Sequence, residues 1–350
     1  MIDLRSDVLA TISANVLEAL SAAAAQKAGF GRRDCAEESA LAEETAALFG
    51  FEDALFVPTG TMANQIAIRL WCAPGEVIVA DHQTHVVTNE AASVAGINGV
   101  NFRLIAGERG HIAPDQLRIA LAEPDGSAGD RRIRLVWLEN THNRAGGTIM
   151  PAAWQAALAD ICQQHRVPLH IDGARIWNAI GVDGTAPGIV ARGAASMMTA
   201  LNKIVGAPVG ALLLGERGFI EEAARVQKMF GGLWRPAGLL AAAARQALRE
   251  WPTRVQAVRE LARIFAERLG AEIGPTHCPP RPDTNIVMIQ LRDDAEARRL
   301  AETLVACSLL VSPYRNGKLR CVFHTGITAD DAARSAELFA ASFSQLRMTG

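Results

Sequence analysis

One lysine in this 350-residue chain has surroundings that suggest covalent chemistry. Lys203 lies in the run TALNKIVGAPVGALLLG (residues 199–215), and the next acidic residue along the chain is Glu216. An apolar setting disfavours the charged form of an amine, which favours the neutral nucleophile that forms a Schiff base. Gly206 and Gly210 would let the backbone approach a flat ligand. The alternative is an ordinary lysine whose ammonium group reaches solvent or a phosphate.

A glycine between two threonines follows the apolar run ALFVP (residues 54–58). The pattern predicts a strand that ends here and a helix that begins near Gly60 and Thr61. A helix N-terminus carries partial positive charge and unpaired backbone N–H groups, so it can bind an oxyanion such as phosphate. A simple helix cap is the alternative for these residues.

Histidines follow two further apolar runs. His85 comes shortly after EVIVA (residues 76–80), and His142 belongs to the polar run after IRLVWLE (residues 133–139). An imidazole at such a place can transfer protons, stack on a ring or bind a metal. The alternatives are a solvated loop for His85 and a cap or turn for the run around His142.

An acid and an arginine follow the run VPLHI (residues 167–171). Asp172 and Arg175 either form an internal ion pair or bind different parts of a ligand, the acid a cationic ring nitrogen and the arginine a carboxylate. Pyridoxal phosphate needs anion contacts, an acid for its ring nitrogen and a Schiff-base lysine. Because ligands bind at the carboxyl ends of strands in such sheets, the sequence predicts one pyridoxal-phosphate site there.

The elements that position these residues alternate along the first 250 residues. Apolar runs are separated by helical patterns of about 10–15 residues, which predicts an α/β fold with a mostly parallel sheet between helices. Later the pattern changes to helix 253–270, strand 285–291, helix 294–306, strand 319–323 and helix 328–346. We therefore expect a large domain over residues 1–250, including the N-terminal segment, and a small α+β domain over residues 251–350.

Composition excludes several classes of protein. Hydrophobic residues make up 49% and charged residues 21% of the chain, and the net charge of −2 argues against a nucleic-acid partner. The six cysteines are scattered, which argues against zinc and disulfides and favours a reducing cytoplasm. The charged segment MIDLRSDVLA does not have the pattern of a signal peptide, and the longest apolar stretch is shorter than the roughly 20 residues that span a membrane. We expect a cytoplasmic protein with no membrane partner.

The order of the motifs resembles the threonine aldolase family of fold-type I (aspartate aminotransferase-like) pyridoxal-phosphate enzymes. The resemblance covers nearly the whole chain and rests on the segments MIDLRSD, LFVPTGTMAN, LENTHN, HIDGARIWNA, NKIVGAPVGALLLG, RVQKMFGGLWRPAG, RPDTN and LRCVFH. It implies the fold-type I transferase fold, with a seven-stranded, mostly parallel sheet and a small C-terminal domain. It also implies a homotetramer built from dimers, with active sites at the dimer interface.

The resemblance implies a role for each matching residue. Lys203, His85 and His142 would be catalytic, and no residue is assigned to a metal. The cofactor pyridoxal 5′-phosphate would be held by Gly60, Thr61, His85, Asp172, Arg175, Lys203 and, from a neighbouring subunit, Arg235. The amino-acid substrate would be held by Ser6, His142, Arg175 and Arg320.

The implied reaction is retro-aldol cleavage of an L-β-hydroxy-α-amino acid to glycine and an aldehyde. Threonine, allo-threonine, phenylserine or an acidic analogue would be the substrate. The base for the β-hydroxyl proton stays open among His85, His142 and a water held by them. One alternative is another reaction of the same cofactor on the same fold, namely β-elimination, transaldol transfer or racemisation. The other alternative is that the chain is a non-catalytic relative of these enzymes.

Two segments depart from the family pattern. Phe30-Gly31-Arg32-Arg33-Asp34 replaces a common Tyr-Gly-Asp-Asp run, and either this is a surface loop or one arginine faces the mouth of the site and favours an anionic substrate. Asn202 stands before the lysine where serine is usual, with Ile204 and Val205 after it. The asparagine amide can bond the cofactor phosphate as the serine hydroxyl does, but it is bulkier than serine.

Overall fold

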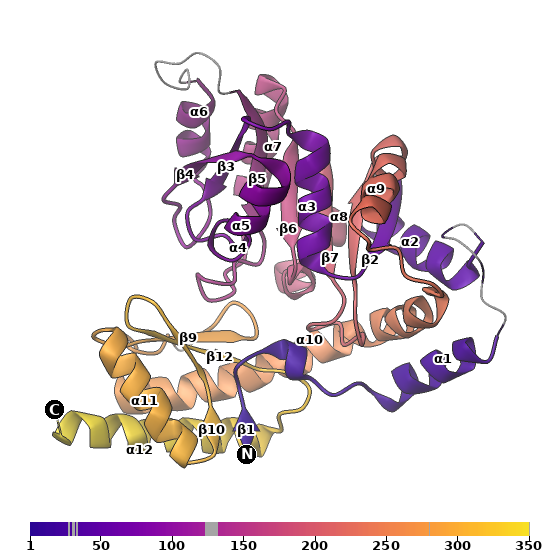
Figure 1. The fold of residues 1–350 in the computed structure, drawn as a ribbon. Helices are drawn as coiled ribbons and strands as arrows, with labels where there is room; N and C mark the ends of the chain where they lie inside the picture. The colour runs from indigo at the N-terminus through magenta and orange to yellow at the C-terminus, as the bar shows by residue number, and fades with distance from the viewer. Residues whose placement is uncertain (27–28, 30–31, 33, 123–131, 280, 350) are drawn as a thin grey trace. The chain divides into compact units, whose positions relative to one another are not determined.

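The structure, a computed structural model, describes the chain except residues 27–28, 30–31, 33, 123–131, 280 and 350 (Figure 1). The chain divides into two compact units. Residues 12–144 and 149–249 form the sheet unit, and residues 1–11, 145–148 and 250–350 form the small unit. The domain boundary expected between residues 250 and 251 stays a prediction.

A seven-stranded sheet forms the centre of the sheet unit. Its strands are β2 (Asp53–Val57), β3 (Val77–Asp81), β4 (Asn101–Ile105), β5 (Ile133–Glu139), β6 (Leu169–Gly173), β7 (Ser196–Ala200) and β8 (Ala211–Gly215). The order is β2-β8-β7-β6-β5-β3-β4, and β8 runs in the direction opposite to the other six strands. The predicted α/β fold with a mostly parallel sheet is confirmed.

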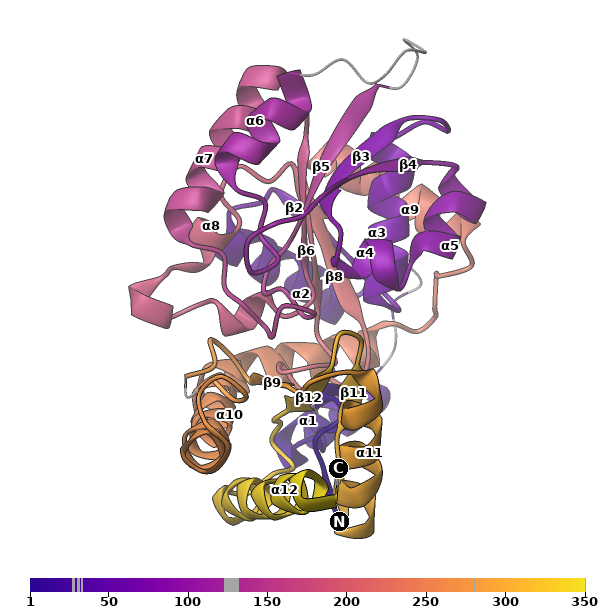
Figure 2. The ribbon, with the colours of Figure 1, turned by 90° about the vertical axis from the view of Figure 1, so that its left-hand side faces the viewer.

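Helices cover both faces of this sheet, as Figure 2 shows with the sheet seen edge-on. α3 (Gly60–Trp71) and α9 (Arg217–Met229) pack against each other on one face, and α6 (Pro114–Ala122), α7 (Ala152–His165) and α8 (Pro187–Val190) lie on the other. The unit also contains α1 (Ala14–Ala24), α2 (Ala36–Phe49), α4 (His85–Thr88) and α5 (Ala91–Ser93). Because both faces are covered, every residue of β3, β6, β7 and β8 is buried.

The strand that carries the predicted acid is shifted along the sequence. The run VPLHI predicts a strand over residues 167–171, but β6 forms over Leu169–Gly173. Asp172 is therefore the fourth residue of β6 and pairs with Glu139 of β5 on one side and Met198 of β7 on the other. A carboxylate inside a central strand must be buried, which the sequence pattern did not indicate.

The small unit has its own antiparallel sheet in the order β11-β12-β9. Its elements are β1 (Ile2–Asp3), β9 (Ile286–Gln290), α11 (Asp294–Ala306), β10 (Leu309–Leu310), β11 (Ser312–Tyr314), β12 (Lys318–Val322) and α12 (Ala329–Thr349). The N-terminal segment belongs to this unit, because β1 pairs with β10 and the Val322 N–H donates to the Leu4 carbonyl at 2.8 Å.

One long helix, α10 (Gly238–Ile273), replaces two stretches that the sequence marks as helical. The alanine-rich run and the predicted helix 253–270 join in it, with Pro252 inside the helix. Proline removes a single N–H donor, so a helix with favourable residues on both sides can continue through it at a cost of about 3 kcal/mol. Within the described residues, no helix has the length and apolar character needed to cross a membrane.

Two glycines with positive φ should differ in how much stability an alanine substitution costs. Gly210 has φ +106°, and an added Cβ would lie 2.4 Å from the Phe56 ring, whereas Gly50 has φ +82° and open space around its Cβ position. We expect Gly50→Ala to lower the free energy of unfolding by about 1 kcal/mol through backbone strain alone. Gly210→Ala should cost about 3 kcal/mol or more, because overpacking adds to the strain. Urea unfolding measures both, and equal costs would contradict the packing argument.

Candidate active site

The sheet unit contains a cavity of about 200 Å³ at the carboxyl edge of its sheet. The residues that line it come from the ends of β2, β3, β5, β6 and β7 or from the segments that follow these strands. They are Thr59, Gly60, Thr61, His85, Glu90, Glu139, Thr141, Asn143, Asp172, Ala174, Arg175, Met198, Ala200, Asn202 and Lys203. The structure thus brings together six of the predicted site residues, Gly60, Thr61, His85, Asp172, Arg175 and Lys203.

The N-terminus of α3 opens into this cavity. Thr59 is the N-cap and its Oγ1 accepts from the Met62 N–H at 3.1 Å. An added Cβ on Gly60 would lie 3.2 Å from the Met198 side chain, so a larger residue would crowd the entrance to the helix. A twelve-residue helix directs its dipole and free N–H groups at this point, as a phosphate seat requires.

Asp172 is the buried carboxylate of the site, with 1% of its surface exposed. Its Oδ1 accepts from the Ala174 N–H at 3.1 Å and its Oδ2 from Asn64 Nδ2 at 2.9 Å. Burial, together with the Glu139 charge, raises the pKa of Asp172 to about 6, against the opposing effect of His85 and Lys203. A cation placed against Asp172 would stabilise its ionised form, which is what a protonated pyridine nitrogen offers.

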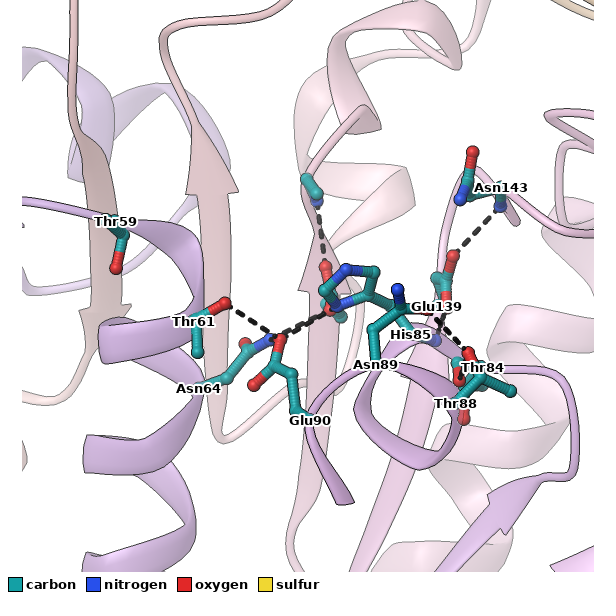
Figure 3. A network of polar contacts seen from close by, with 12 residues as sticks. Thr59, Thr61, Asn64, Thr84, His85, Thr88, Asn89, Glu90, Glu139 and Asn143 are labelled. Carbon is teal, nitrogen blue, oxygen red and sulfur yellow. Dashed lines mark hydrogen bonds and ion pairs between the residues drawn. The ribbon is translucent and has the colours of Figure 1, made fainter. Parts of the chain in front are cut away.

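Glu90 connects His85 to the other side chains of the site (Figure 3). Its Oε1 lies 2.8 Å from His85 Nδ1 and accepts from Asn64 Nδ2 at 3.1 Å and Thr61 Oγ1 at 3.4 Å. Its Oε2 accepts from Gln65 Nε2 at 2.9 Å. Glu90 is therefore held in one position by donors from α3 and by the His85 ring.

Glu139, the last residue of β5, fixes two loops at the edge of the cavity. Its Oε2 accepts from the His85 N–H at 2.5 Å and its Oε1 from the Asn143 N–H at 2.9 Å. Arg175, only 5% exposed, reaches the same loop, where its Nη1 donates to Asn143 Oδ1 at 3.5 Å. The backbone position of His85 therefore depends on Glu139, and its ring position on Glu90.

Lys203 has acidic neighbours in space, although it has none nearby in the sequence. It shares the cavity with Glu90, Glu139 and Asp172, and its charge lowers the pKa of Asp172. The interpretation of Lys203 as an amine remote from carboxylates was wrong, because segments distant in the sequence supply them. Of the two nearby glycines, Gly210 makes room for the Phe56 ring, so its lack of a side chain serves packing.

His142 lies behind the cavity wall. Its side chain is fully buried, and its Nε2 lies 3.2 Å from Asp81 Oδ1, while its neighbours Thr141 and Asn143 line the cavity. Asp81 also accepts from the Gly107 and Gln83 N–H groups at 2.8 and 2.9 Å. Burial raises the pKa of Asp81, but its hydrogen bonds outweigh this effect and lower the pKa below its usual value. Burial lowers the pKa of His142, but the charges of Glu139 and Asp81 outweigh this effect and raise the pKa. The two therefore form a buried ion pair.

This ion pair predicts a specific pH dependence of stability. Because folding raises the pKa of His142, its contribution to stability is fully present below pH 6.5, its usual pKa, and is lost as the pH rises through the higher pKa of the folded state. Because folding lowers the pKa of Asp81, its contribution to stability is lost only as the pH falls below 3.8, its usual pKa. Asp81→Asn should lower the free energy of unfolding by about 3 kcal/mol near pH 5 and by much less near pH 9. Urea unfolding of both proteins at the two pH values measures this, and a pH-independent difference would contradict the pairing.

Three other predicted residues lie outside the cavity wall. Ser6 and Arg320 belong to the small unit, where Ser6 Oγ accepts from the Val8 N–H at 3.4 Å and Arg320 Nη2 donates to the Arg5 carbonyl at 2.9 Å. Arg235 is exposed on the sheet unit. The roles assigned to these residues, and to His142, stay predictions.

Arg32 does not face the mouth of the cavity. Its Nη2 lies 2.5 Å from Asp53 Oδ1 and donates to the Ala54 carbonyl at 2.6 Å. Asp53 begins β2, whereas Thr59, just past the other end of β2, lines the cavity. The hypothesis that Arg32 selects an anionic substrate is therefore wrong for this cavity, while Phe30, Gly31 and Arg33 lie outside the described residues.

The sequence analysis missed the residues that hold the ionisable groups in place. Asn64 donates to both Glu90 and Asp172, and Gln65 donates to Glu90. Asn64 and Gln65 are adjacent amides in the segment MANQIAI, whose other residues are all apolar, and this contrast could have indicated them from the sequence. Glu90 lies between two short helices and had no such signal.

The same cluster also has the spacing of a possible metal site. Within the described part of the chain, one ligand atom each from His85, Glu90 and Asp172 lies within 4.8 Å of the others. Because Asn64, Gln65 and Thr61 donate to Glu90 and Asn64 also donates to Asp172, these oxygens are already used. We interpret the cluster as a hydrogen-bonded charge network.

A mostly parallel sheet whose carboxyl edge joins a lysine, a buried acid and a helix N-terminus defines the fold-type I class of pyridoxal-phosphate enzymes. Residues 3–294 match the beta-eliminating lyase family, and the chain belongs to this family. It is 32% identical over 343 residues to low-specificity L-threonine aldolase 1 of Arabidopsis thaliana, covering 97% of this chain and 95% of that protein. It is 33% identical over 342 residues to low specificity L-threonine aldolase of Escherichia coli strain K12, covering 96% and 97%.

Solved structures share the fold. Leishmania major threonine aldolase superposes with a TM-score of 0.83 at 18% identity, covering 97% of this chain and 99% of that chain. A putative aromatic amino acid beta-eliminating lyase/threonine aldolase from Exiguobacterium superposes with a TM-score of 0.78 at 20% identity, covering 98% and 97%. The fold predicted from the sequence is confirmed.

Proposed function

We propose that this chain is a pyridoxal 5′-phosphate enzyme that cleaves an L-β-hydroxy-α-amino acid to glycine and an aldehyde. The observation that carries the proposal is the single cavity shared by Lys203, Asp172 and the α3 N-terminus at Gly60. Relatives named as threonine aldolases, at 32 and 33% identity over nearly the full length, support the same reaction.

The residues of the cavity fit this cofactor. The α3 N-terminus at Gly60 and Thr61 would hold the phosphate, Asp172 the ring nitrogen, and Lys203 the aldehyde carbon through a Schiff base. When bound, the cofactor supplies a ring that accepts the electron pair of the bond that breaks. The Asn202 amide, beside Lys203 in the cavity wall, is available to bond the phosphate in place of serine.

The chain's own residues would orient the substrate and move its protons. Arg175 would bind the substrate carboxylate and so fix the orientation of the bond between Cα and Cβ that breaks. A base must remove the β-hydroxyl proton before the aldehyde leaves. His85 lines the cavity directly, whereas His142 does not line it and is paired with Asp81.

A substrate panel tests the proposed reaction. Threonine, allo-threonine, phenylserine and β-hydroxyaspartate should each be assayed for glycine, aldehyde, ammonia and keto acid. We expect glycine and aldehyde in equal amounts from at least one substrate, and loss of at least about 10³-fold in rate for Lys203→Ala, which removes the nucleophile. Lys228→Ala, on α9 outside the cavity wall, is the matched control.

The products separate the alternatives. Ammonia and keto acid without glycine would show β-elimination and contradict the aldolase proposal. Inverted substrate without cleavage would show racemisation, and glycine formed only with a second aldehyde present would show transaldol transfer. No turnover and no cofactor absorbance that depends on Lys203 would identify a non-catalytic relative.

The assembly and the location belong to the same proposal. A homotetramer of dimers would place Arg235 of one subunit at the site of another, and α1 offers an apolar contact surface, with Leu17 49% exposed. All six cysteines are free thiols, which supports a reducing cytoplasm. The sequence and cavity suggest a small amino-acid substrate rather than nucleic acid.

Subunit complementation tests the shared site. Lys203→Ala and Arg235→Ala should each be inactive or nearly so, and mixed dimers contain one site with both residues intact. Co-expression of the two variants should therefore restore roughly a quarter of wild-type activity if subunits mix at random. Mixing Lys203→Ala with Asp172→Asn, two changes in one cavity wall, is the control that should restore none. No restoration in the first pair would place Arg235 in its own subunit's site or outside it.

A further inference from the structure

We propose that Glu90 is a positioning residue that keeps His85 protonated, so that His85 acts as a fixed positive charge and not as the base of the reaction. This inference deepens the proposed function and rests on it for the identity of the reaction. Two observations carry it: the contact of Glu90 with His85 Nδ1 at 2.8 Å, and the set of donors that hold Glu90 itself.

The geometry assigns the ring nitrogens of His85. Glu90 accepts hydrogen bonds from Asn64, Gln65 and Thr61, so we assign it as the acceptor of the contact with His85 as well, and Nδ1 bears the proton that points to it. The nitrogen that remains for a ligand is Nε2. The ring cannot rotate away without leaving Glu90, a side chain only 3% exposed, short of a partner.

The charges around His85 favour a second proton on Nε2. Glu90, Glu139 and Asp172 face it as anions, and Lys203 and Arg175 are the cations in the same cavity wall. Burial lowers the pKa of His85, but the hydrogen bond to Glu90 and the charges of Asp172, Glu90 and Glu139 raise it above its usual value. With His85 charged, the cavity wall has three anions and three cations before any ligand binds.

A charged His85 changes the proton chemistry of the site. An imidazolium has no lone pair in the ring, so it cannot remove the β-hydroxyl proton. It can donate from Nε2 and stabilise negative charge on a ligand. The base then has to be another group, such as a water molecule or His142 after release from Asp81.

Histidine titration tests the charge without any turnover. In the loaded enzyme labelled with ¹³C-histidine, the His85 resonance is identified by its loss in His85→Asn. We expect its titration midpoint above about pH 7 in the wild type and lower by about one unit or more in Glu90→Gln, which keeps an amide acceptor but loses the charge. Glu38→Gln, at another buried carboxylate outside the cavity wall, should leave the midpoint unchanged.

Activity against pH tests the role. If His85 acts as a positive charge, Glu90→Gln should lose about three- to fivefold in kcat/KM near pH 7 and regain most of it near pH 6, where His85 is protonated again. If His85 is the base, Glu90→Gln should keep or gain activity near pH 7, and that result would overturn the proposal. A wild-type midpoint at or below 6.5 would also overturn it, with no variant required.

A second variant covers the case in which Glu90→Gln does not fold, and the titration distinguishes failure of this proposal from failure of the proposed function. If Glu90→Gln does not fold, Glu90→Asp retains the charge at a longer distance and should lower the midpoint by a smaller amount. An absence of aldolase activity in the wild type would refute the proposed function, whereas the titration midpoint would still decide whether Glu90 keeps His85 protonated.

Discussion

The active site depends on the burial of one carboxylate, Asp172, inside a central strand. An acid at this depth loses its hydration, and its pKa rises to about 6 even though the charges of His85 and Lys203 oppose the rise. The surrounding structure supplies part of the compensation for this burial through Asn64, the Ala174 N–H, and the charges of Lys203 and His85. A cationic ring nitrogen would complete it, so the fold forms a site that favours a protonated heterocycle.

The burial of Asp172 also fixes the position of a second acid, Glu90. Because Asn64 donates to both Asp172 and Glu90, the two carboxylates are held by one amide, and neither can move without disturbing the other. Glu90 then fixes the His85 ring, and Glu139 fixes its backbone. The charge network places Glu90 against His85, whereas the phosphate seat at the α3 N-terminus relies on backbone N–H groups and the helix dipole.

Much of the fold and the ligand-binding edge could be predicted from the sequence, because apolar runs and the polar residues after them are local signals. Lys203, Gly60 and Asp172 meet in one cavity for this reason. The network behind them could not be predicted, since Glu90 and Asn64 are separated from Asp172 by 82 and 108 residues and only strand order brings them together. The two-residue shift of β6 and the sequestered His142 depend on tertiary packing in the same way.

Binding of pyridoxal phosphate to the cofactor-free protein tests the central claim most directly. The measurement is a spectroscopic titration of the wild type and of Asp172→Asn, which has nearly the same shape but no charge. If the buried carboxylate selects a cationic ring, Asp172→Asn should bind the cofactor at least about tenfold more weakly, with a changed absorption spectrum. Equal affinity and an unchanged spectrum in the two proteins would contradict the account.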